Sequence, residues 1–471
     1  MVISTVTRTI SDTVGAANEQ ITDTLFGAPI RLGVTGLARS GKTVFITSLV
    51  ANLLEQGRMS QLHAMAQGRI ETAFLQPQPN DTVARFDYEG NLAALTGPTP
   101  RWPDNTKTIS QLRVSLKVKP NGMLSGFRSA HIQHLDIIDY PGEWLLDLSL
   151  LDKSFEDWSK DTLARLSYRK SAQTYLNKLS EIDPNADLDE PLAKALTQEF
   201  TTYLNAARED GYSDLTPGRF LLPGDLQGSP VLTFAPLTLD GRPPRGSLGR
   251  EFKRRFEAYK SNVVRPFFRV HFARIDRQIV LVDVLGALHN GPRAIEDLRR
   301  TMRDILKAFR PGTNSTVSRL LRGARVDRIL FAATKADHLH QSQHASLNAM
   351  MQALTDDAAR EARFKGAQTL ALSIASVRST TEETRPHKGA EIDCVRGTVL
   401  DSGKQAVFFA GELPYDPQIV LSQTTDLPET WLEGEFSAMR FAPPPSALRH
   451  GEGIAHIRLD RAAEYLFGDR L

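Results

Sequence analysis

Eight consecutive residues near the start of the sequence have the types and spacing needed to hold a phosphate chain. They fit the pattern G-x-x-x-x-G-K-[ST] and read Gly36-Leu37-Ala38-Arg39-Ser40-Gly41-Lys42-Thr43. The glycines let the backbone curl so that its amide groups point at an anion. Lys42 is expected to reach the β- and γ-phosphates of a nucleotide, and the Thr43 hydroxyl to bind Mg²⁺. The predicted contacts are Gly36, Ala38, Arg39, Ser40, Gly41, Lys42, Thr43 and Val44.

A second motif is an apolar strand that ends in Asp-x-x-Gly. Residues 135–143 read Leu-Asp-Ile-Ile-Asp-Tyr-Pro-Gly-Glu, so Asp139 follows the apolar run and Gly142 comes three residues later. Asp139 is predicted to hold Mg²⁺ through water, and the Gly142 amide to sense a γ-phosphate. The same form recurs at Asp283, where the alternative interpretation is an aspartate that caps the following turn. Chain order and the flanking Pro-Gly-Glu favour Asp139.

Two further segments have the chemistry to read a base. The run Thr334-Lys335-Ala336-Asp337 follows an apolar strand. A carboxylate at Asp337 can accept hydrogen bonds from N1–H and the exocyclic amine of guanine, a donor pair that adenine lacks. The stem of Lys335 is expected to lie over the base. Backbone amides near Ser376 and Val377, in a small-residue loop, are expected to cap guanine O6. Guanine is therefore the predicted base.

These motifs can act together only if an α/β fold brings them to one edge of a sheet. The periodicity predicts a strand before the phosphate loop, a helix over 43–54 after it, and a hairpin of strands at 109–118 and 132–139. Further strands are predicted at 267–272, 278–284, 328–333 and 369–374. After residue 380 the pattern predicts short strands at 407–409 and 439–441 and a helix over 460–467.

Residues 151–263 have a different texture, with aromatic residues and leucines near helical spacing. The predicted fold class is therefore α/β, a sheet flanked by helices with a helical insertion. The predicted units are an N-terminal helical arm (1–25), a nucleotide-binding domain (26–150 and 264–380), a helical insertion domain (151–263) and a C-terminal α+β extension (381–471).

The composition is that of an ordinary soluble globular protein. The chain has 471 residues, of which 41% are hydrophobic and 24% charged, and its formal net charge is +2. That charge does not indicate nucleic acid as a specific partner, although arginine and lysine are dense between Arg242 and Arg277. The single cysteine, Cys394, favours a reducing compartment, and no signal peptide is expected, so we predict a cytoplasmic location. No segment requires peripheral membrane contact, and the oligomeric state is not predicted.

The four motifs stand in the order phosphate loop, Asp-x-x-Gly, Thr-Lys-x-Asp and small-residue loop. This order resembles that of the Ras-type translational GTPase superfamily over residues 26–150 and 264–380. More closely, the chain resembles the YcjX-like family of bacterial stress-induced P-loop proteins over nearly its whole length. The phosphate loop, the run Asp-Tyr-Pro-Gly-Glu-Trp-Leu-Leu-Asp (139–147) and the ending Arg-Leu-Asp-Arg-Ala-Ala-Glu-Tyr-Leu-Phe-Gly-Asp (458–469) carry this resemblance.

The resemblance implies a Ras-like fold that binds GTP or GDP with Mg²⁺, an inserted helical domain, and a protein effector that the sequence does not identify. Glu143 stands where Ras-like enzymes carry a water-orienting glutamine. An ionised glutamate can take a proton from water but repels the γ-phosphate, so we expect slow hydrolysis. Thr334 stands where asparagine is usual, which removes a side-chain amide that ties the base loop to the phosphate loop.

The switch threonine that closes over Mg²⁺ is predicted to be Thr106, with Thr108 as the alternative. Arg101 is either an arginine finger in cis or a solvated side chain. The predicted catalytic residues are Lys42, Glu143 and Thr106, and the predicted metal-binding residues are Thr43, Asp139 and Thr106.

The favoured hypothesis is a molecular switch in which bound GTP orders residues 97–108 and 140–150, and hydrolysis releases them. Two alternatives remain. One is an ATP-dependent enzyme such as a kinase. The other is a stress adaptor in which the nucleotide is a folding cofactor with negligible turnover.

Overall fold

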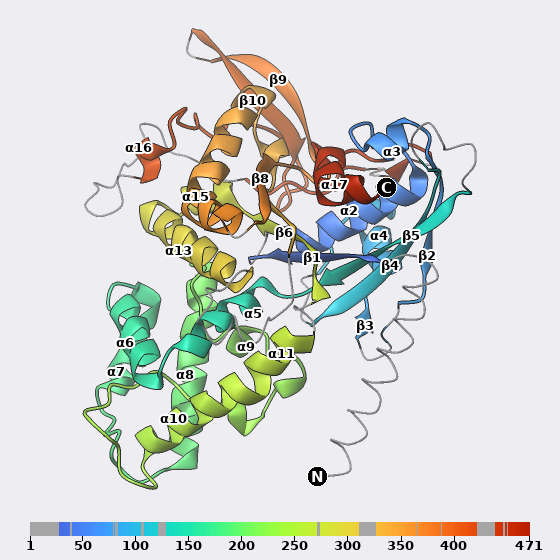
Figure 1. Cartoon of the computed structure of the whole chain (residues 1–471). Helices are drawn as coiled ribbons and strands as arrows, with labels where there is room; N and C mark the ends of the chain where they lie inside the picture. Colours follow the sequence, from blue (N-terminus) through green and yellow to red (C-terminus); the bar gives the residue numbers. More distant parts are fainter. Residues whose placement is uncertain are drawn as a thin grey trace.

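A mixed β-sheet lies at the centre of the computed structural model, with helices on both of its faces (Figure 1). The structure describes residues 28–37, 40–78, 80, 83–104, 108–120, 129–270, 274–309, 326–364, 366–387, 389–421, 439–445, 448–449 and 451–471. Within these residues eight strands form the sheet, in the order β2-β4-β5-β1-β6-β7-β8 with β3 beside β4. They are β1 (Ile30–Gly36), β2 (Ile70–Gln76), β3 (Ala84–Arg85), β4 (Ser110–Val118), β5 (His131–Asp139), β6 (Arg277–Val282), β7 (Arg328–Ala333) and β8 (Gln368–Ser373).

The direction of the strands decides where the motifs meet. Strand β1 lies between β5 and β6 and is parallel to both, and β6, β7 and β8 continue in parallel. Strands β4 and β5 form the predicted antiparallel hairpin, with Ser110 opposite Asp139. Parallel strands place their carboxyl ends at one edge, and a ligand site is expected where the strand order reverses. Here that point is the end of β1.

Alternating side chains of the buried strands serve two hydrophobic clusters, one on each face of the sheet. In β6, Ile279 and Leu281 join one cluster, whereas Val280 and Val282 join the other. This explains why the strand reads as a continuous apolar run in the sequence, since both of its faces are covered. Among the helices, α2 (Lys42–Glu55), α4 (Tyr88–Thr96) and α17 (Leu459–Phe467) contribute to the first cluster, and α12 (Val284–His289), α13 (Pro292–Phe309) and α15 (His344–Phe364) to the second.

Residues 142–270, called the helical segment below, lie beneath the sheet in Figure 1. Trp158 stacks on Phe256 with ring centroids 5.1 Å apart and meets Phe200 edge-on, which gives this segment an aromatic core. Side-chain caps start its longer helices: Ser154 accepts from the amide of Asp157, for example. Its α-helices are α5 (Gly142–Leu146), α6 (Phe155–Leu166), α7 (Gln173–Leu179), α8 (Glu190–Glu209), α9 (Gly218–Leu221), α10 (Leu248–Tyr259) and α11 (Arg265–Val270).

The strand predicted at 267–272 is wrong for residues 267–270, and residues 271–272 lie outside the described residues. Residues 265–270 form helix α11, which follows a π-helical turn over Lys260–Val264. Val263 and Val264 are buried, and so are Phe267 and Phe268, whereas the residues between these pairs are exposed. Buried pairs repeated every four residues mark one face of a helix. The run of apolar residues alone did not show this spacing.

The arginine- and lysine-rich stretch that includes α10 is engaged in ion pairs. Arg255 contacts Glu190 and Glu251, Arg254 contacts Glu251, and Lys253 contacts Glu156. These carboxylates neutralise the three cations, of which Arg255 is buried, Lys253 is half-buried and Arg254 is exposed.

A smaller antiparallel sheet follows the last strand of the central sheet. It consists of β9 (Thr380–His387), β10 (Ala390–Thr398) and β11 (Gln405–Phe408), in the order β11-β10-β9. The strand predicted at 439–441 is wrong in the described residues, where Phe441 forms an isolated bridge with Val399. Strands β12 (Leu448–Arg449) and β13 (Gly453–Ile454) form a short ladder, and the short helices α3 (His63–Ala66) and α16 (Gln418–Leu421) complete the set.

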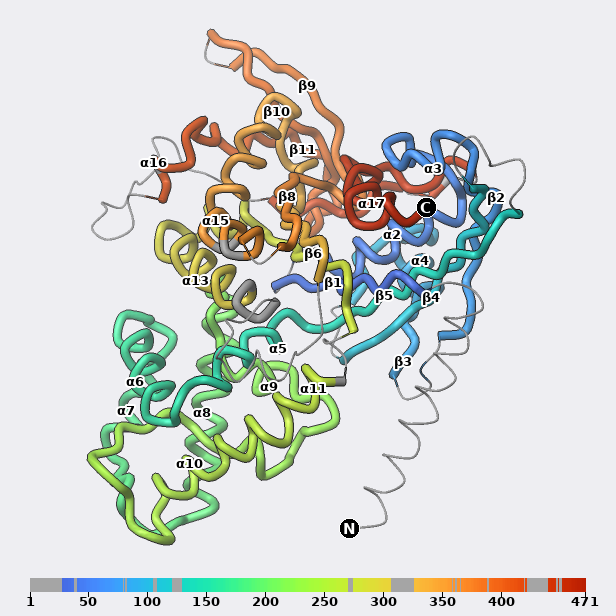
Figure 2. The backbone as a smooth tube through the Cα atoms, viewed as in Figure 1, coloured from blue at the N-terminus to red at the C-terminus, as the bar shows by residue number. Residues whose placement is uncertain are grey.

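The chain returns to the central sheet at its end. Helix α17, predicted over 460–467, contacts β6 and β7 and shares a hydrophobic cluster with α2 (Figures 1 and 2). Asp469 accepts a hydrogen bond from Arg277 of β6 and contacts Arg328 of β7. The helical arm predicted for residues 1–25 lies outside the described residues. In the described part of the chain, no helix is long and apolar enough to cross a membrane.

Candidate nucleotide-binding site

The phosphate loop lies between the end of β1 and the start of α2, at the edge where the parallel strands end. Gly41 has φ +80°, a left-handed conformation that favours glycine. A Cβ at Gly36 would lie 2.1 Å from Ser40 Oγ, so the turn closes tightly only with glycine there. The Ser40 hydroxyl is buried and has no hydrogen-bond partner among the described residues. An unpaired buried donor inside such a turn fits an anion. Ala38 and Arg39 lie outside the described residues.

The two phosphate-binding motifs touch each other. Lys42 Nζ lies 2.7 Å from Asp139 Oδ1, and the aspartate side chain is 1% exposed. A Cβ at Gly142 would lie 2.4 Å from the carbonyl oxygen of Gly36, so the Asp-x-x-Gly segment packs directly on the phosphate loop. The structure therefore places Lys42, Asp139 and Gly142 at one point of the sheet edge.

Thr43 and Asp139 supply oxygen atoms of the kind that Mg²⁺ prefers. The Thr43 hydroxyl also donates to the carbonyl oxygen of Asp104 at 3.4 Å, so the segment before the predicted switch threonine reaches the same place. Thr106 itself lies outside the described residues. Thr108 is exposed.

Asp283, the second Asp-x-x-Gly candidate, has a structural task. Its Oδ1 accepts a hydrogen bond of 3.0 Å from the amide of Gly286 and so caps α12. Its Oδ2 accepts from Lys335 Nζ. The capping role that the sequence left open for Asp283 is therefore what the structure shows, and the aspartate also fixes the direction of Lys335.

The base-reading segment is a tight turn after β7. Lys335 adopts φ +62°, and Asp337 is 4% exposed. Asp337 Oδ2 accepts hydrogen bonds from the amide (2.9 Å) and the hydroxyl (2.5 Å) of Ser379. In the described residues, Oδ1 of the same carboxylate has no recorded hydrogen bond and remains available to a ligand. Sequence reasoning missed Ser379, although the serine-containing run that begins at Ser373 continues to it.

Hydrogen bonds join the base loop to its neighbours. The Ser48 hydroxyl of α2 donates to the carbonyl oxygen of Ser376, and the Ala336 amide donates to that of Ile374 at 3.0 Å. The Thr334 hydroxyl donates a hydrogen bond to the carbonyl oxygen of Val282. Ser48 therefore links the phosphate-loop helix to the small-residue loop, and the Ala336 amide links the Thr-Lys-x-Asp segment to the strand end that precedes this loop.

One cavity of about 700 Å³ connects part of the phosphate loop with the base-reading segment, whereas Lys42, Thr43, Asp139 and Gly142 are not among the residues that line it. Its walls include residues predicted from the sequence, namely Ser40, Gly41, Val44, Glu143, Lys335, Asp337, Ser376 and Val377. They also include residues that the sequence did not indicate: Arg208 from the helical segment, and His338, Phe408 and Phe441 near or in the C-terminal part. A cavity of this size can hold a ligand of nucleotide dimensions.

At the phosphate end of the cavity, Glu143 is 8% exposed. Burial raises the pKa of its carboxyl above the ordinary value, while a backbone hydrogen bond and the charges of Lys42 and Arg208 act in the opposite direction. Glu143 therefore has a stronger tendency to be neutral than a surface glutamate.

At the other end, residues from the C-terminal part form the wall. The ring of Phe441 meets that of His338 edge-on, with centroids 5.1 Å apart, and burial lowers the pKa of the histidine. Trp102 Nε1 donates to the carbonyl oxygen of Phe441 at 2.7 Å. These contacts join distant parts of the chain, so no local pattern predicted them.

The chain is similar to known proteins over most of its length. The model of the YcjX-like family, DUF463, matches residues 30–471. A protein of Shewanella oneidensis named Ras-like GTPase YcjX is 35% identical over 470 residues, which cover 94% of each chain. A protein of the same name from Escherichia coli is 36% identical over 461 residues, covering 94% of this chain and 96% of its own. On these findings, the chain belongs to the YcjX-like family.

Proposed function

We propose that the chain is a Mg²⁺-dependent guanine-nucleotide-binding protein that hydrolyses GTP slowly and changes conformation between its GTP and GDP forms. One observation carries the proposal: a single cavity joins the phosphate loop to the carboxylate of Asp337. The names of the two relatives support the GTPase class. A bacterial stress role and a cytoplasmic location stay predictions.

In this proposal the two ends of the cavity hold the two ends of the nucleotide. Amides of the phosphate loop and the N-terminus of α2 bind the phosphates, and Lys42 balances their charge. Asp337 accepts from the guanine ring with Oδ1, while Ser379 holds its Oδ2 in place. Lys335, held by Asp283, covers one face of the base.

Thr43 and Asp139 are the residues that would hold Mg²⁺, together with Thr106 as predicted from the sequence. The ion would neutralise charge on the β- and γ-phosphate oxygens. Glu143 is proposed to orient the attacking water. Its ionised form repels the γ-phosphate, and we attribute slow hydrolysis to this.

The switch part of the proposal relies on the contact between residues 140–150 and the helical segment. Asp147 accepts from the Gly218 amide at 2.8 Å and from the Tyr259 hydroxyl. A Cβ at Gly218 would lie 2.1 Å from the carbonyl oxygen of Glu143. Such close packing supports the transmission of movement from the Asp-x-x-Gly segment to an inserted domain, for which we keep the boundaries 151–263. A protein effector would read this movement.

Two other functions remain as alternatives. An ATP-dependent enzyme would not use the Asp337 carboxylate against the base. A stress adaptor would bind GDP and gain stability from it without turnover. Base preference and turnover separate these three possibilities.

The experiment that tests the proposal is fluorescence titration of labelled GDP, GTP, ATP and xanthosine diphosphate, with and without Mg²⁺. We expect tight binding of guanine nucleotides. In Asp337→Asn the side chain offers one donor and one acceptor, which match xanthine instead of guanine. GDP affinity should fall roughly 100-fold and xanthosine diphosphate affinity should rise.

Asp356→Asn, on the outer part of α15, is the matched control, because the same change there should leave every affinity as it is. ATP binding equal to or tighter than GTP binding in the wild type would refute the guanine assignment. Guanine binding with no release of phosphate over hours would favour the adaptor.

A further inference from the structure

Three cationic side chains among the described residues line the cavity: Arg208, Lys335 and Arg440. Two of them have carboxylate partners. Lys335 pairs with Asp283, and Arg440 pairs with Asp401 at 2.7 Å. Within the described chain, the side chain of Arg208 forms no ion pair and no hydrogen bond, whereas its carbonyl oxygen accepts from the amide of Gly211. A half-buried guanidinium without a carboxylate partner, at the wall of a cavity, is suited to an anionic ligand.

Arg208 belongs to the phosphate end of the cavity. Its charge is felt by Glu143, where it opposes the effect of burial on the carboxyl pKa, as Lys42 does from the phosphate loop. The other two cations belong to the base end, where Lys335 neighbours Asp337. Among the described residues that line the cavity, Arg208 is thus the cation of the helical segment, and it lies on the side of Glu143.

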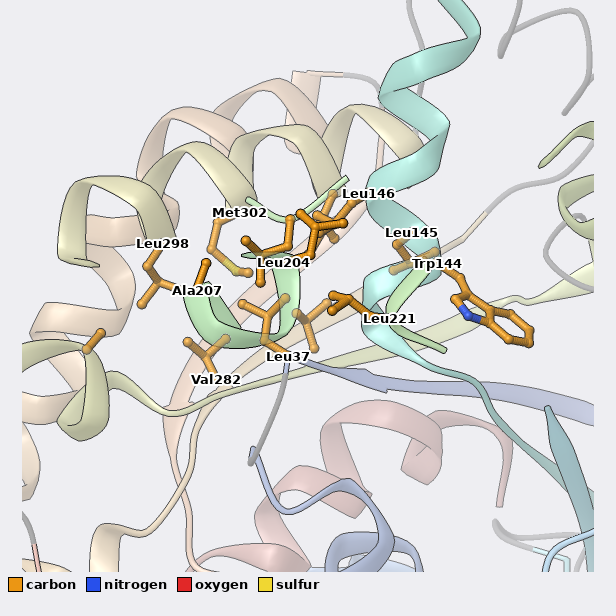
Figure 3. Close-up of a cluster of buried hydrophobic side chains, with 14 of the residues drawn as sticks. Leu37, Trp144, Leu145, Leu146, Leu204, Ala207, Leu221, Val282, Leu298 and Met302 are labelled. Atoms are coloured by element: carbon orange, nitrogen blue, oxygen red, sulfur yellow. The ribbon is translucent and has the colours of Figure 1, made fainter. Parts of the chain in front are cut away.

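Packing fixes the position of the helix backbone at Arg208. Leu204 and Ala207, in the same last turns of α8, are buried. Figure 3 shows them in one cluster with Leu37 of the phosphate loop and Leu298 of α13. The helix end that carries Arg208 is therefore packed against the loop that would hold the phosphates.

Hydrogen bonds and ion pairs also hold the segment that follows α8. Asp297 Oδ2 of α13 accepts hydrogen bonds from the amides of Ser213 and Asp214. The buried guanidinium of Arg169 forms ion pairs with the carboxylates of Asp214 and Asp297. This network ties the chain that follows α8 to α13, so the backbone that carries Arg208 is held in place without a ligand.

A basic residue in the last turn of a helix also interacts favourably with the helix dipole. The dipole interaction does not require the side chain to be half-buried or to line the cavity. Arg208 is half-buried and lines the cavity. Arg101, the arginine that the sequence suggested for this role, is exposed and does not line the cavity.

We propose that Arg208 contacts the transferred phosphoryl group, so that the helical segment supplies in cis the arginine of GTP hydrolysis. This inference rests on the proposed function. In the reaction, the oxygen of water bonds to the γ-phosphorus while the bond from that phosphorus to the β–γ bridging oxygen breaks. GDP and phosphate leave, and the proton of water passes to the phosphate. Arg208 stabilises the negative charge that collects on the bridging and γ-oxygens.

The test combines single-turnover GTP hydrolysis with the binding of GDP–aluminium fluoride, which mimics the transition state. We expect Arg208→Ala to slow hydrolysis roughly 100- to 1,000-fold and to lose aluminium fluoride binding. Its affinity for labelled GDP should change less than about threefold, because a GDP complex has no γ-phosphoryl group. Arg208→Lys keeps the charge but not the fork of donors and should recover only part of the rate. Guanidinium added to Arg208→Ala should restore part of it.

Lys194→Ala is the matched control, since it removes an exposed cation from the same helix. Hydrolysis by Arg208→Ala within about threefold of the wild type, with aluminium fluoride still bound, would overturn the inference. A wild type that binds GTP without hydrolysing it would also overturn it and leave nucleotide binding intact. A wild type that binds no guanine nucleotide would refute the proposed function as well.

Discussion

Glu143 is the residue where the demands of packing and of catalysis conflict. It is nearly buried beside the phosphate loop, and burial favours its neutral form. A neutral carboxyl can orient water without repelling a γ-phosphate, whereas the ionised form can take the proton but carries the wrong charge. The nearby charges of Lys42 and Arg208 act against burial and lower the pKa of this carboxyl.

Replacing this carboxyl by an uncharged amide should speed the reaction. We expect Glu143→Gln to raise the rate of single-turnover GTP hydrolysis roughly tenfold. Removing the charge should remove about 1.4 kcal/mol of repulsion with the γ-phosphate, and this energy corresponds to a factor of ten in rate. Phosphate release at saturating GTP measures it. Glu199→Gln, on the outer part of α8, is the control. A slower Glu143→Gln variant would show instead that the carboxylate acts as the base.

Single residues differed in how far the sequence could predict them. The phosphate loop is contiguous, and the type of every member limits what it can do. Ser379 and Arg208 are recognisable only through contacts with Asp337 and with the cavity wall, which join segments far apart in the chain. A lone serine or arginine in a sequence carries no such information.

At the scale of elements, α5 is the connection between the sheet edge and the helical segment. Asp147, directly after it, is buried between Gly218 of α9 and Tyr259 of α10. Burial raises the pKa of Asp147 to about 7, against the hydrogen bonds from Tyr259 and Gly218 that lower it. Its protonation state therefore affects how tightly these elements pack.

This gives a stability prediction with a definite sign. The pKa of Asp147 in the folded chain lies above its unfolded value, so its stabilising contribution is complete below about pH 4 and is lost as the pH rises through about 7. The loss is about 4 kcal/mol at most over the whole range between the two pKa values. We expect the free energy of unfolding, from urea titrations between about pH 5 and pH 8, to fall less steeply in Asp147→Asn than in the wild type. Asp161→Asn, at an exposed site of α6, should keep the slope of the wild type. Equal slopes in all three proteins would contradict the assignment.

The buried strands and the hairpin were predictable because both faces of the sheet impose a clear apolar pattern. The apolar pattern predicted the wrong secondary structure where the apolar run was short. Residues 265–270 form a helix because their buried pairs face one side, and 439–441 make a single bridge. The C-terminal wall of the cavity could not be predicted, since Phe441 is positioned by Trp102 and His338 from other parts of the chain.

For the whole molecule, the cavity is a place where distant segments meet. A ligand that binds there stabilises all of them together, by about 2.7 kcal/mol at a hundredfold excess over Kd. We expect Mg²⁺ with GDP to raise the midpoint of thermal unfolding by roughly 2–4 °C or more, and ADP to have little effect. Removing Mg²⁺ with EDTA should reduce the shift, because the phosphates lose a counter-charge. Differential scanning fluorimetry measures it, and equal shifts with GDP and ADP would contradict the base assignment.

Strand β1 has a consequence for how the chain acquires its structure. One of its two neighbouring strands, β6, is synthesised late. The Arg31 amide donates to Asp276, directly before β6 and 245 residues further along the chain. At synthesis rates of about 5–20 residues per second, roughly 12–50 seconds pass before β6 exists. Until then one edge of this mostly buried strand lacks β6 as its partner and can pair with other chains. Early folding of β1 is thus a hazard during translation, and a nascent chain that is held by a chaperone over this interval should yield more native protein.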